Sequence, residues 1–316
     1  MPELAENLIS NASFISELIS NLDSLKTITS NKKETFYNVA AGFDIETSSF
    51  YDKNDLKTAI MYEWTFGIGW ERNNELKAIV TYGRTWRQLE TLLDAVSVIM
   101  DLGKSKRLVV YVHNLPYEWQ FIRKRFSWSK VFYLDERKPV YAIADNGIEF
   151  RCSLKLSGKS LANTAKDLVK YKAMKMEGDL DYSLIRHPET PLTPTELGYC
   201  YADVQVLLCY IQEKIEQEGD ITRIPLTKTG YVRRYCKNAM FPEGSVQNEQ
   251  DTYADLDFET AGVSSVERSI SRRIYPRKCS PSRDDPYQSW FIRLYEFLSR
   301  EHGRVQIPDE CRSIHW

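Results

Sequence analysis

Three short polar stretches interrupt the apolar segments in the first two-thirds of this 316-residue chain, and together they carry four carboxylates and a tyrosine. They are Phe43-Asp44-Ile45-Glu46-Thr47, His113-Asn114-Leu115-Pro116-Tyr117-Glu118 and Tyr199-Cys200-Tyr201-Ala202-Asp203. Carboxylates that are buried close together either stay protonated or require cations. Because hard oxygen ligands suit Mg²⁺ or Mn²⁺, a fold that gathers these acids is expected to bind such ions.

The first stretch is predicted to lie where a buried strand ends. The apolar run Val39-Ala40-Ala41-Gly42-Phe43 leads directly into Asp44 and Glu46. These two side chains share one face of a strand, because side chains alternate with a period of two. Two acids so spaced are usually a solvated edge or a turn, and the preceding apolar run argues against that alternative.

The second stretch follows a predicted strand over residues 108–112. After a polar break, a short helix is expected over residues 117–126, with Tyr117 and Phe121 facing inward. Glu118 falls in the first turn of that helix, where an acid is favoured simply because the helix N-terminus is partly positive. Glu118 taken alone therefore does not indicate catalysis.

The third stretch lies on a helix with a clear start. Thr193-Pro194-Thr195-Glu196 fits a capping box with proline at the first helical position, and the apolar periodicity continues to about Ile215. Tyr199 and Asp203 are four residues apart and share a face of this helix. A tyrosine there is more often core than catalytic, so its role depends on Asp203. Two divalent ions about 3.5–4 Å apart, held by such acids, would favour phosphodiester hydrolysis.

These stretches resemble the exonuclease domain of family B DNA polymerases, most closely the protein-primed group of phages and linear plasmids, over roughly residues 37 to 210. The family patterns D-x-E-[ST], N-x-x-[FY]-D and Y-x-x-x-D are matched by residues 44–47, 114–118 and 199–203. One position departs from the pattern, because Glu118 stands where the family has aspartate. The resemblance implies a 3'→5' exonuclease of a DNA-directed DNA polymerase.

The resemblance also implies a role for each matching residue. Asp44, Glu46 and Asp203 would bind two Mg²⁺ or Mn²⁺ ions, Tyr199 would orient the attacking water, and Glu118 would complete the catalytic set. The residues expected to hold the 3' end of single-stranded DNA, or of a primer, are Thr47, Asn114, Tyr117, Ser153 and Leu154. The family's lysine before a Gly-Asp-hydrophobic-Asp-Tyr run is Glu177 here, and Lys175 is expected to substitute for it.

The expected fold is α/β, with a ribonuclease H-like mixed sheet flanked by helices. Residues 1–36 are predicted to form an N-terminal helix, over residues 3–27, and a linker; residues 37–240 form the exonuclease domain. Within this domain we expect paired strands at 62–70 and 76–82, a helix at 86–100, and a hairpin turning at Asp145-Asn146-Gly147.

Composition is consistent with an intracellular, soluble enzyme. The six cysteines show no zinc-ligand spacing, no apolar run approaches membrane-spanning length, and the N-terminus lacks a basic leader. The expected location is the cytoplasm of a cell carrying a phage, prophage or plasmid, or an organelle. With a net charge of −2, nucleic-acid binding would depend on a local basic face. The candidate members of that face are Arg123, Lys124, Arg125, Lys130, Lys155 and Lys159. The alternative is that these residues form an ordinary solvated surface.

Residues 241–316 are expected to be a remnant of the start of the polymerase region followed by a poorly structured tail. With the reading frame advanced by one base, residues 272–278 can encode GGFTHAN and residues 291–309 can encode SFDFTSSYPASMVAYRFPM. Both strings resemble the first palm motifs of the same polymerases, so we expect a frameshift between roughly Met240 and Ser265.

A polymerase palm is therefore not expected in this chain, although a terminal protein is a partner of the full-length family. Two alternatives remain open: an inactive polymerase remnant that at most binds single strands, and an independent DEDD exonuclease that acts on RNA.

Overall fold

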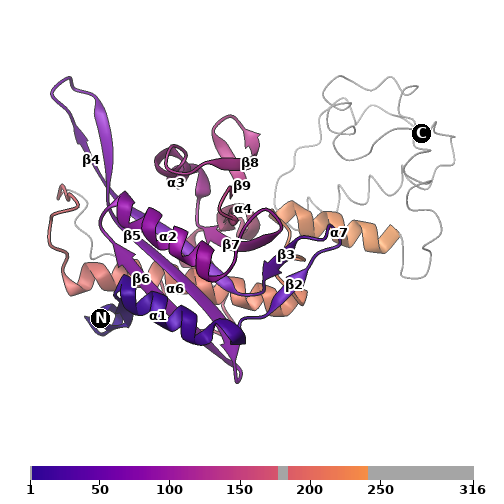
Figure 1. Ribbon diagram of the computed structural model, residues 1–316. Helices are drawn as coiled ribbons and strands as arrows, with labels where there is room; N and C mark the ends of the chain where they lie inside the picture. The colour runs from indigo at the N-terminus through magenta and orange to yellow at the C-terminus, as the bar shows by residue number, and fades with distance from the viewer. Residues whose placement is uncertain (1, 177–183, 241–316) are drawn as a thin grey trace, which may run out of the picture. The chain divides into compact units, whose positions relative to one another are not determined.

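The computed structural model describes residues 2–176 and 184–240, and its centre is a mixed β-sheet (Figure 1). Within the described residues the strands follow the order β1-β6-β5-β4-β7-β10-β9-β8, and β2 and β3 attach beside β7. The strands are β1 (Leu8–Ile9), β2 (Thr27–Thr29), β3 (Thr35–Tyr37), β4 (Ala40–Tyr51), β5 (Lys57–Arg72), β6 (Glu75–Gly83), β7 (Lys106–Val112), β8 (Trp128–Asp135), β9 (Lys138–Ala144) and β10 (Ile148–Cys152).

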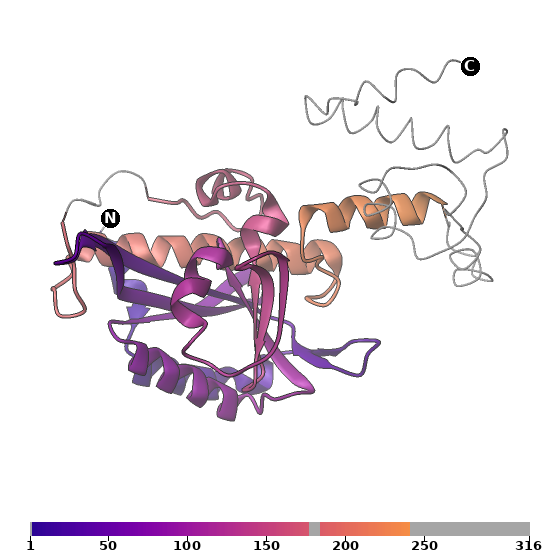
Figure 2. The same cartoon turned by 90° about the horizontal axis from the view of Figure 1, so that it is seen from above.

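Helices cover both faces of this sheet. Those of the described residues are η1 (Pro2–Asn7), α1 (Asn11–Asn21), η2 (Leu22–Ser24), α2 (Trp86–Ile99), α3 (Leu115–Ile122), α4 (Ser153–Ser157), α5 (Leu161–Lys166), α6 (Pro194–Glu218) and α7 (Lys228–Met240). Helices α1, α2 and α3 pack into one apolar cluster with the sheet, and α4, α5 and α6 pack into a second cluster on the other face. Figure 2 shows α6 along one side of the sheet and α1 with α2 along the opposite side. The expected ribonuclease H-like α/β arrangement is therefore confirmed.

The first part of strand β4 lies between two other strands, whereas the rest of β4 has a strand neighbour on one side only. It pairs with antiparallel β5 along its whole length, but with parallel β7 only at Gly42 and Phe43. Strand β7 ends at Val112, so from Asp44 onward the β7 side of β4 has no strand neighbour within the described residues. The first acidic pair therefore stands where β4 has a strand neighbour on the β5 side only.

Two glycines allow α6 to approach the sheet closely. A Cβ added at Gly42 would lie 3.2 Å from Leu207 Cδ2, and one added at Gly67 would lie 3.0 Å from Leu208 Cδ1. Glycine is used where two elements approach this closely, because it presents no side chain. Asp203 lies one helical turn before Leu207, and Asp44 lies two residues after Gly42 on the same strand face. The close packing therefore brings Asp203 toward Asp44.

Most elements expected from the sequence are present. The β5–β6 hairpin turns at Asn73 and Asn74, which both have positive φ, and the β9–β10 hairpin turns at Gly147, with φ of 85°. The capping box at Thr193 is formed as expected. No helix among the described residues is long and apolar enough to cross a membrane. The expectations for the tail fall on residues 241–316, outside the described part of the chain.

Three details differ from expectation. The segment 3–27 is not one helix, because Leu8 and Ile9 pair with β6 and Ser10 then caps α1 by accepting a hydrogen bond from the Ser13 amide. The strand that carries Asp44 does not end there but continues to Tyr51.

Tyr117 also does not face inward; its side chain is exposed. Helix α3 starts at Leu115, and its buried positions are Leu115, Glu118, Trp119 and Ile122, which is the spacing of one helical face and leaves Tyr117 outside it.

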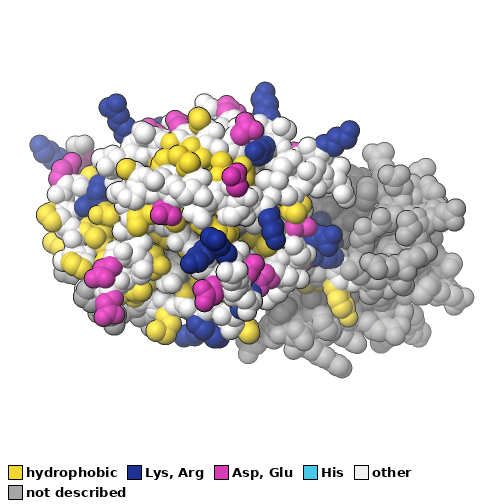
Figure 3. All heavy atoms as spheres, turned by 60° about the horizontal axis from the view of Figure 1, so that its bottom comes forward, with side chains coloured by type: hydrophobic (Ala, Val, Ile, Leu, Met, Phe, Trp, Pro, Cys, Tyr) yellow, Lys and Arg dark blue, Asp and Glu magenta, His cyan; other side chains and the backbone are white. Residues whose placement is uncertain are grey.

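The charged side chains are mixed on the face drawn in Figure 3. Lys and Arg side chains alternate there with Asp and Glu, and no continuous field of one sign covers that face. This distribution agrees with a net charge of only −2.

Candidate functional site

Asp44, Glu46 and Asp203 come together where α6 crosses β4. One carboxylate oxygen of each lies within 4.8 Å of the others, so all three can reach a single ion. Asp44 and Glu46 share a face of β4 because of strand alternation, and Asp203 faces them from α6. The convergence expected from the sequence is confirmed.

Glu118 approaches the same place from α3. Its carboxylate is buried, and the negative charge of Asp44 is close enough to disfavour its ionisation. The position depends on Asn114, which caps α3 in the left-handed conformation, with φ of 81° and ψ of 49°. Asparagine adopts this conformation more readily than most residues, and here it turns the chain sharply between β7 and α3.

A fifth carboxylate, Glu63, was not identified from the sequence. It stands directly opposite Glu46 in the β4–β5 ladder and is fully buried. Its Oε1 accepts a hydrogen bond of 2.6 Å from Thr65 Oγ1. The only signal in the sequence is an acid inside an otherwise apolar strand. We refer to Asp44, Glu46, Glu63, Glu118 and Asp203 as the acidic cluster.

The environment of the acidic cluster disfavours the ionisation of its carboxyl groups. Burial, and then the charges of Glu63 and Asp203, raise the pKa of Glu46 to about 8. Burial likewise raises the pKa of Glu63 to about 8. Burial followed by the charge of Glu46 raises the pKa of Asp44 well above its usual value. Such a site becomes fully ionised at neutral pH only if positive charge enters it.

The chain itself supplies limited positive charge here. Lys175 Nζ lies 2.6 Å from Asp203 Oδ2 and 5.0 Å from the centre of the Tyr199 ring. The second cation is Arg186, a buried residue whose Nε donates to Glu196 Oε1 at 2.6 Å and whose charge favours ionisation of Glu46. Arg84 adds a third charge, which favours ionisation of Glu63. Within the described residues three cations therefore act on five carboxylates, and Arg186 also pairs with Glu196.

Unused acceptor atoms fit a metal site. Glu118 Oε2 and Asp203 Oδ1 are buried and accept no hydrogen bond within the described residues. A buried acceptor without a donor costs about 1–3 kcal/mol, and more when it is charged. Oxygen-only ligands arranged in this way suit Mg²⁺ or Mn²⁺ better than softer ions.

The residues expected to hold a strand end have different environments in the structure. The hydroxyl of exposed Tyr117 contacts Thr47 Oγ1, so this pair links α3 to β4 at the surface. The Asn114 side chain makes no capping hydrogen bond. Ser153 is buried and shares a hydrogen bond of 2.9 Å with His113 Nδ1, and Leu154 packs on the apolar cluster beneath α3.

His113 is a second residue whose place was not expected. Burial, and then the charge of Lys175, lower the pKa of His113 to about 4. The imidazole is therefore neutral at pH 7, and it connects the end of β7 to the start of α4 through Ser153. This connection was not evident from the sequence, although His113 lies in the second polar stretch.

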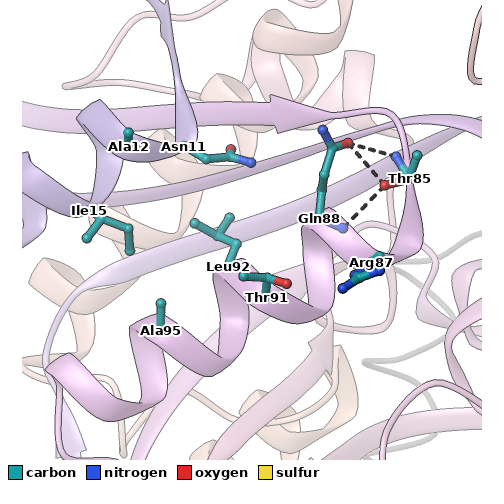
Figure 4. A pocket seen from close by; sticks show the side chains of 9 residues that line it. All are labelled: Asn11, Ala12, Ile15, Thr85, Arg87, Gln88, Thr91, Leu92 and Ala95. Atoms are coloured by element: carbon teal, nitrogen blue, oxygen red, sulfur yellow. Dashed lines mark hydrogen bonds between the residues drawn. The ribbon is translucent and has the colours of Figure 1, made fainter.

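A pocket elsewhere on the molecule does not share this chemistry. It lies between α1 and α2, has a volume of about 490 Å³, and is lined by Asn11, Ile15, Leu92 and neighbouring residues (Figure 4). Of the described residues that line it, Arg87 alone is charged. It also belongs to the sheet face opposite α6, away from the acidic cluster.

Comparison with known proteins agrees with this picture at the level of the fold. No family model matches the chain, and no curated protein matches it. Among solved structures, Phi29 DNA polymerase complexed with primer-template DNA and incoming nucleotides is similar with a TM-score of 0.50 and 16% identity, covering 74% of this chain and 38% of that one. An orthorhombic crystal form of Phi29 DNA polymerase gives a TM-score of 0.47 and 14% identity, with the same two coverages.

The expected resemblance to this polymerase group is thus confirmed as a shared fold. The chain corresponds to well under half the length of the polymerase it matches.

Proposed function

We propose that this chain is a metal-dependent 3'→5' exonuclease that acts on single-stranded DNA ends. The observation that carries the proposal is the convergence of Asp44, Glu46 and Asp203 within 4.8 Å, with Glu118 beside Asp44. A structural cluster of acids would be compensated by basic side chains, whereas within the described residues this one has more carboxylates than cations and two unused acceptor atoms.

Each group has a role in such a reaction. Asp44, Glu46 and Asp203 would hold two Mg²⁺ or Mn²⁺ ions, which supply an activated water and stabilise the leaving oxygen. Glu118 would complete this set from α3. Tyr199, one turn before Asp203 on α6, would orient the attacking water with its hydroxyl.

The surroundings of the site suit an unpaired strand end. Thr47 and Tyr117 offer a polar and an aromatic group, Asn114 offers an amide, and Lys175 offers positive charge near Asp203. Aromatic and polar contacts of this kind hold bases without reading their identity. Ser153 and Leu154 would support this contact from the start of α4.

The shared fold supports a relationship to the protein-primed family B DNA polymerases, with a role in replication and proofreading. On this proposal the strand end would be a primer terminus, and a terminal protein would be a partner of the full-length relatives.

The test is degradation of a 5'-labelled single-stranded DNA by the purified full-length chain. We expect stepwise shortening from the 3' end with Mg²⁺ or Mn²⁺ and none with a chelator. Asp44→Ala should abolish the shortening. The matched control is Asp94→Ala, which changes an exposed aspartate on α2 and should leave the activity intact.

Two outcomes would contradict the proposal. Activity retained in Asp44→Ala would assign the cleavage to another nuclease. Cleavage of RNA but not of DNA of the same sequence would favour the RNA exonuclease alternative.

A further inference from the structure

The hairpin of β8 and β9 forms the open edge of the sheet, and it carries exposed aromatic side chains. Strand β8 is last in the strand order, and its side chains Phe132, Tyr133 and Leu134 are 42%, 42% and 51% exposed. Edge strands are normally protected by charged residues or proline, because exposed apolar edges promote association. Three consecutive exposed apolar side chains here indicate a surface that binds something.

Two of the rings and a lysine form an ordered group on one face. Phe132 stacks on Tyr141 of β9, with ring centres 5.6 Å apart and an angle of 24° between the planes. Lys130 Nζ lies 5.7 Å from the centre of the Tyr141 ring and makes no ion pair within the described residues. We refer to Lys130, Phe132 and Tyr141 as the aromatic platform.

The strand register places the aromatic platform on the same sheet face as the metal ligands. Phe132 pairs with Tyr141, Tyr141 with Arg151, Arg151 with Tyr111, and Tyr111 with Gly42. Paired residues point to the same face, and Gly42 shares its face with Asp44. Four strand spacings of about 4.8 Å separate the two ends of this row, which is roughly 19 Å.

The β8–β9 hairpin also turns at the edge of the sheet where β7 and β10 end. Strand β8 runs in the direction of β7 and β10, so the turn after Asp135 lies at the same edge as Val112 and Cys152. Tyr133 also contacts Trp119 of α3, the residue next to Glu118, with ring centres 6.1 Å apart.

The local charge favours a polyanion. Residues 123–141 contain six Lys and Arg residues and only two acids, Asp135 and Glu136, in a chain whose net charge is −2. The two acids lie within 4 Å of Lys138 and Arg137, and Arg125 lies 3.9 Å from Glu90 of α2. The cations of this segment that make no ion pair within the described residues are therefore Arg123, Lys124 and Lys130. Stacked rings beside unpaired cations are the usual means of binding single strands without base selection.

We propose that the aromatic platform binds bases of the single strand several nucleotides upstream of the 3' end held at the acidic cluster. This inference rests on the proposed function, since it assigns the path of the same substrate. Stacking of a base on Phe132, with Lys130 near the phosphates, would keep a long strand bound while its end is removed. Substrates too short to reach the platform would bind only at the acidic cluster.

The test compares dT4 and dT12 binding to the full-length chain carrying Asp44→Asn, which prevents cleavage. Fluorescence anisotropy should show that Phe132→Ala weakens dT12 binding about tenfold and leaves dT4 binding unchanged. Phe132→Leu, which keeps apolar bulk at the edge strand but removes the ring, should give the same result. Lys130→Gln should lower the slope of log affinity against log salt by about 0.7 for dT12.

The controls distinguish a failure of the platform from a failure of the proposed function. Tyr235→Ala, at an exposed tyrosine on α7, and Lys77→Gln, at an exposed lysine on β6, should change neither affinity. Equal dT12 affinity in the parent and both Phe132 variants would overturn the platform, as would equal losses for dT4 and dT12. Failure of the nuclease assay on the parent chain would instead reject the proposed function, because the binding comparison does not require cleavage.

Discussion

Two clusters of buried and half-buried charged side chains lie on the same face of this sheet, and they are built differently. The first is the acidic cluster, in which five carboxylates face Lys175, Arg186 and Arg84 within the described residues. The second, which we call the arginine network, pairs Arg107 with Glu34 and Glu149 at 2.7 and 3.2 Å, and Arg151 with Glu149 at 2.8 Å.

The arginine network is balanced, with two arginines and two glutamates, and each charge has a partner. A balanced buried network contributes to a single packed arrangement but has no need of a ligand. The acidic cluster has excess negative charge that the described residues do not offset. If the proposed function holds, the imbalance of charge, more than burial or the number of acids, is what distinguishes the acidic cluster from a structural network.

The largest expected effect is on activity at the acidic cluster. Glu46→Gln keeps the shape of the side chain but removes a ligand charge, so we expect nuclease activity to fall by more than about 1,000-fold, equivalent to several kcal/mol. Metal-free stability at pH 8 should not fall, because repulsion with Glu63 is relieved. Activity assays and urea unfolding of the same preparation measure both effects. A variant that loses stability and activity together would remove the contrast with the arginine network.

The arginine network should respond in the opposite way. Glu149→Gln leaves Arg107 and Arg151 short of a buried counter-charge, so we expect a stability loss of about 3 kcal/mol. Nuclease activity at a temperature where the variant is folded should remain near that of the parent. Urea unfolding and the nuclease assay again provide the two readouts. An activity loss comparable with that of Glu46→Gln would show that the network belongs to the site.

The pH dependence of stability should distinguish the apo and metal-bound states. Glu46 and Glu63 have usual pKa values near 4.5 and values of about 8 in the folded chain, so the folded state binds more protons between these limits. The contribution of these two groups to stability is therefore fully present below about pH 4.5 and is lost as the pH rises toward 8.

We expect the melting temperature in a chelator to fall over this range for these groups, and Mg²⁺ or Mn²⁺ to reduce the fall by offsetting their charge. A double variant with Glu46→Gln and Glu63→Gln provides the control, because it should show a smaller fall in the chelator. An unchanged pH dependence in that variant would assign the fall to other groups.

The smallest expected effect concerns Tyr199. Tyr199→Phe removes a hydroxyl and no metal ligand, so activity should fall by roughly tenfold while the response of the melting temperature to Mg²⁺ is kept. The rate should be measured with saturating metal, where the loss is in turnover. Loss of the Mg²⁺ response would instead place this tyrosine in the ion-binding shell.

Local sequence patterns predicted much of the fold and the site. Apolar alternation located β5 and β6, and the capping box located the start of α6. Period-two and period-four spacing placed Asp44 with Glu46 and Tyr199 with Asp203 on common faces. These features depend on neighbours within a few residues, so they can be read from a single chain.

Other features could not be read in this way. Glu63 enters the acidic cluster because the β4–β5 register sets it opposite Glu46, and no local pattern specifies that register. Tyr117 points outward because α3 begins at Leu115, two residues before the expected start. The segment before residue 27 breaks at Ser10 because Leu8 and Ile9 find partners on β6, a strand about 70 residues away in sequence.

The sequence by itself determined which chemical groups are present and which face of each strand or helix carries them. The tertiary structure decided the distances between those faces. Gly42 and Gly67 admit α6 close to β4 and β5, and that approach turns three separate acids into one potential ion site. The physical reason is that backbone periodicity acts over a few residues, whereas the meeting of carboxylates depends on how packed elements from distant parts of the chain fit together.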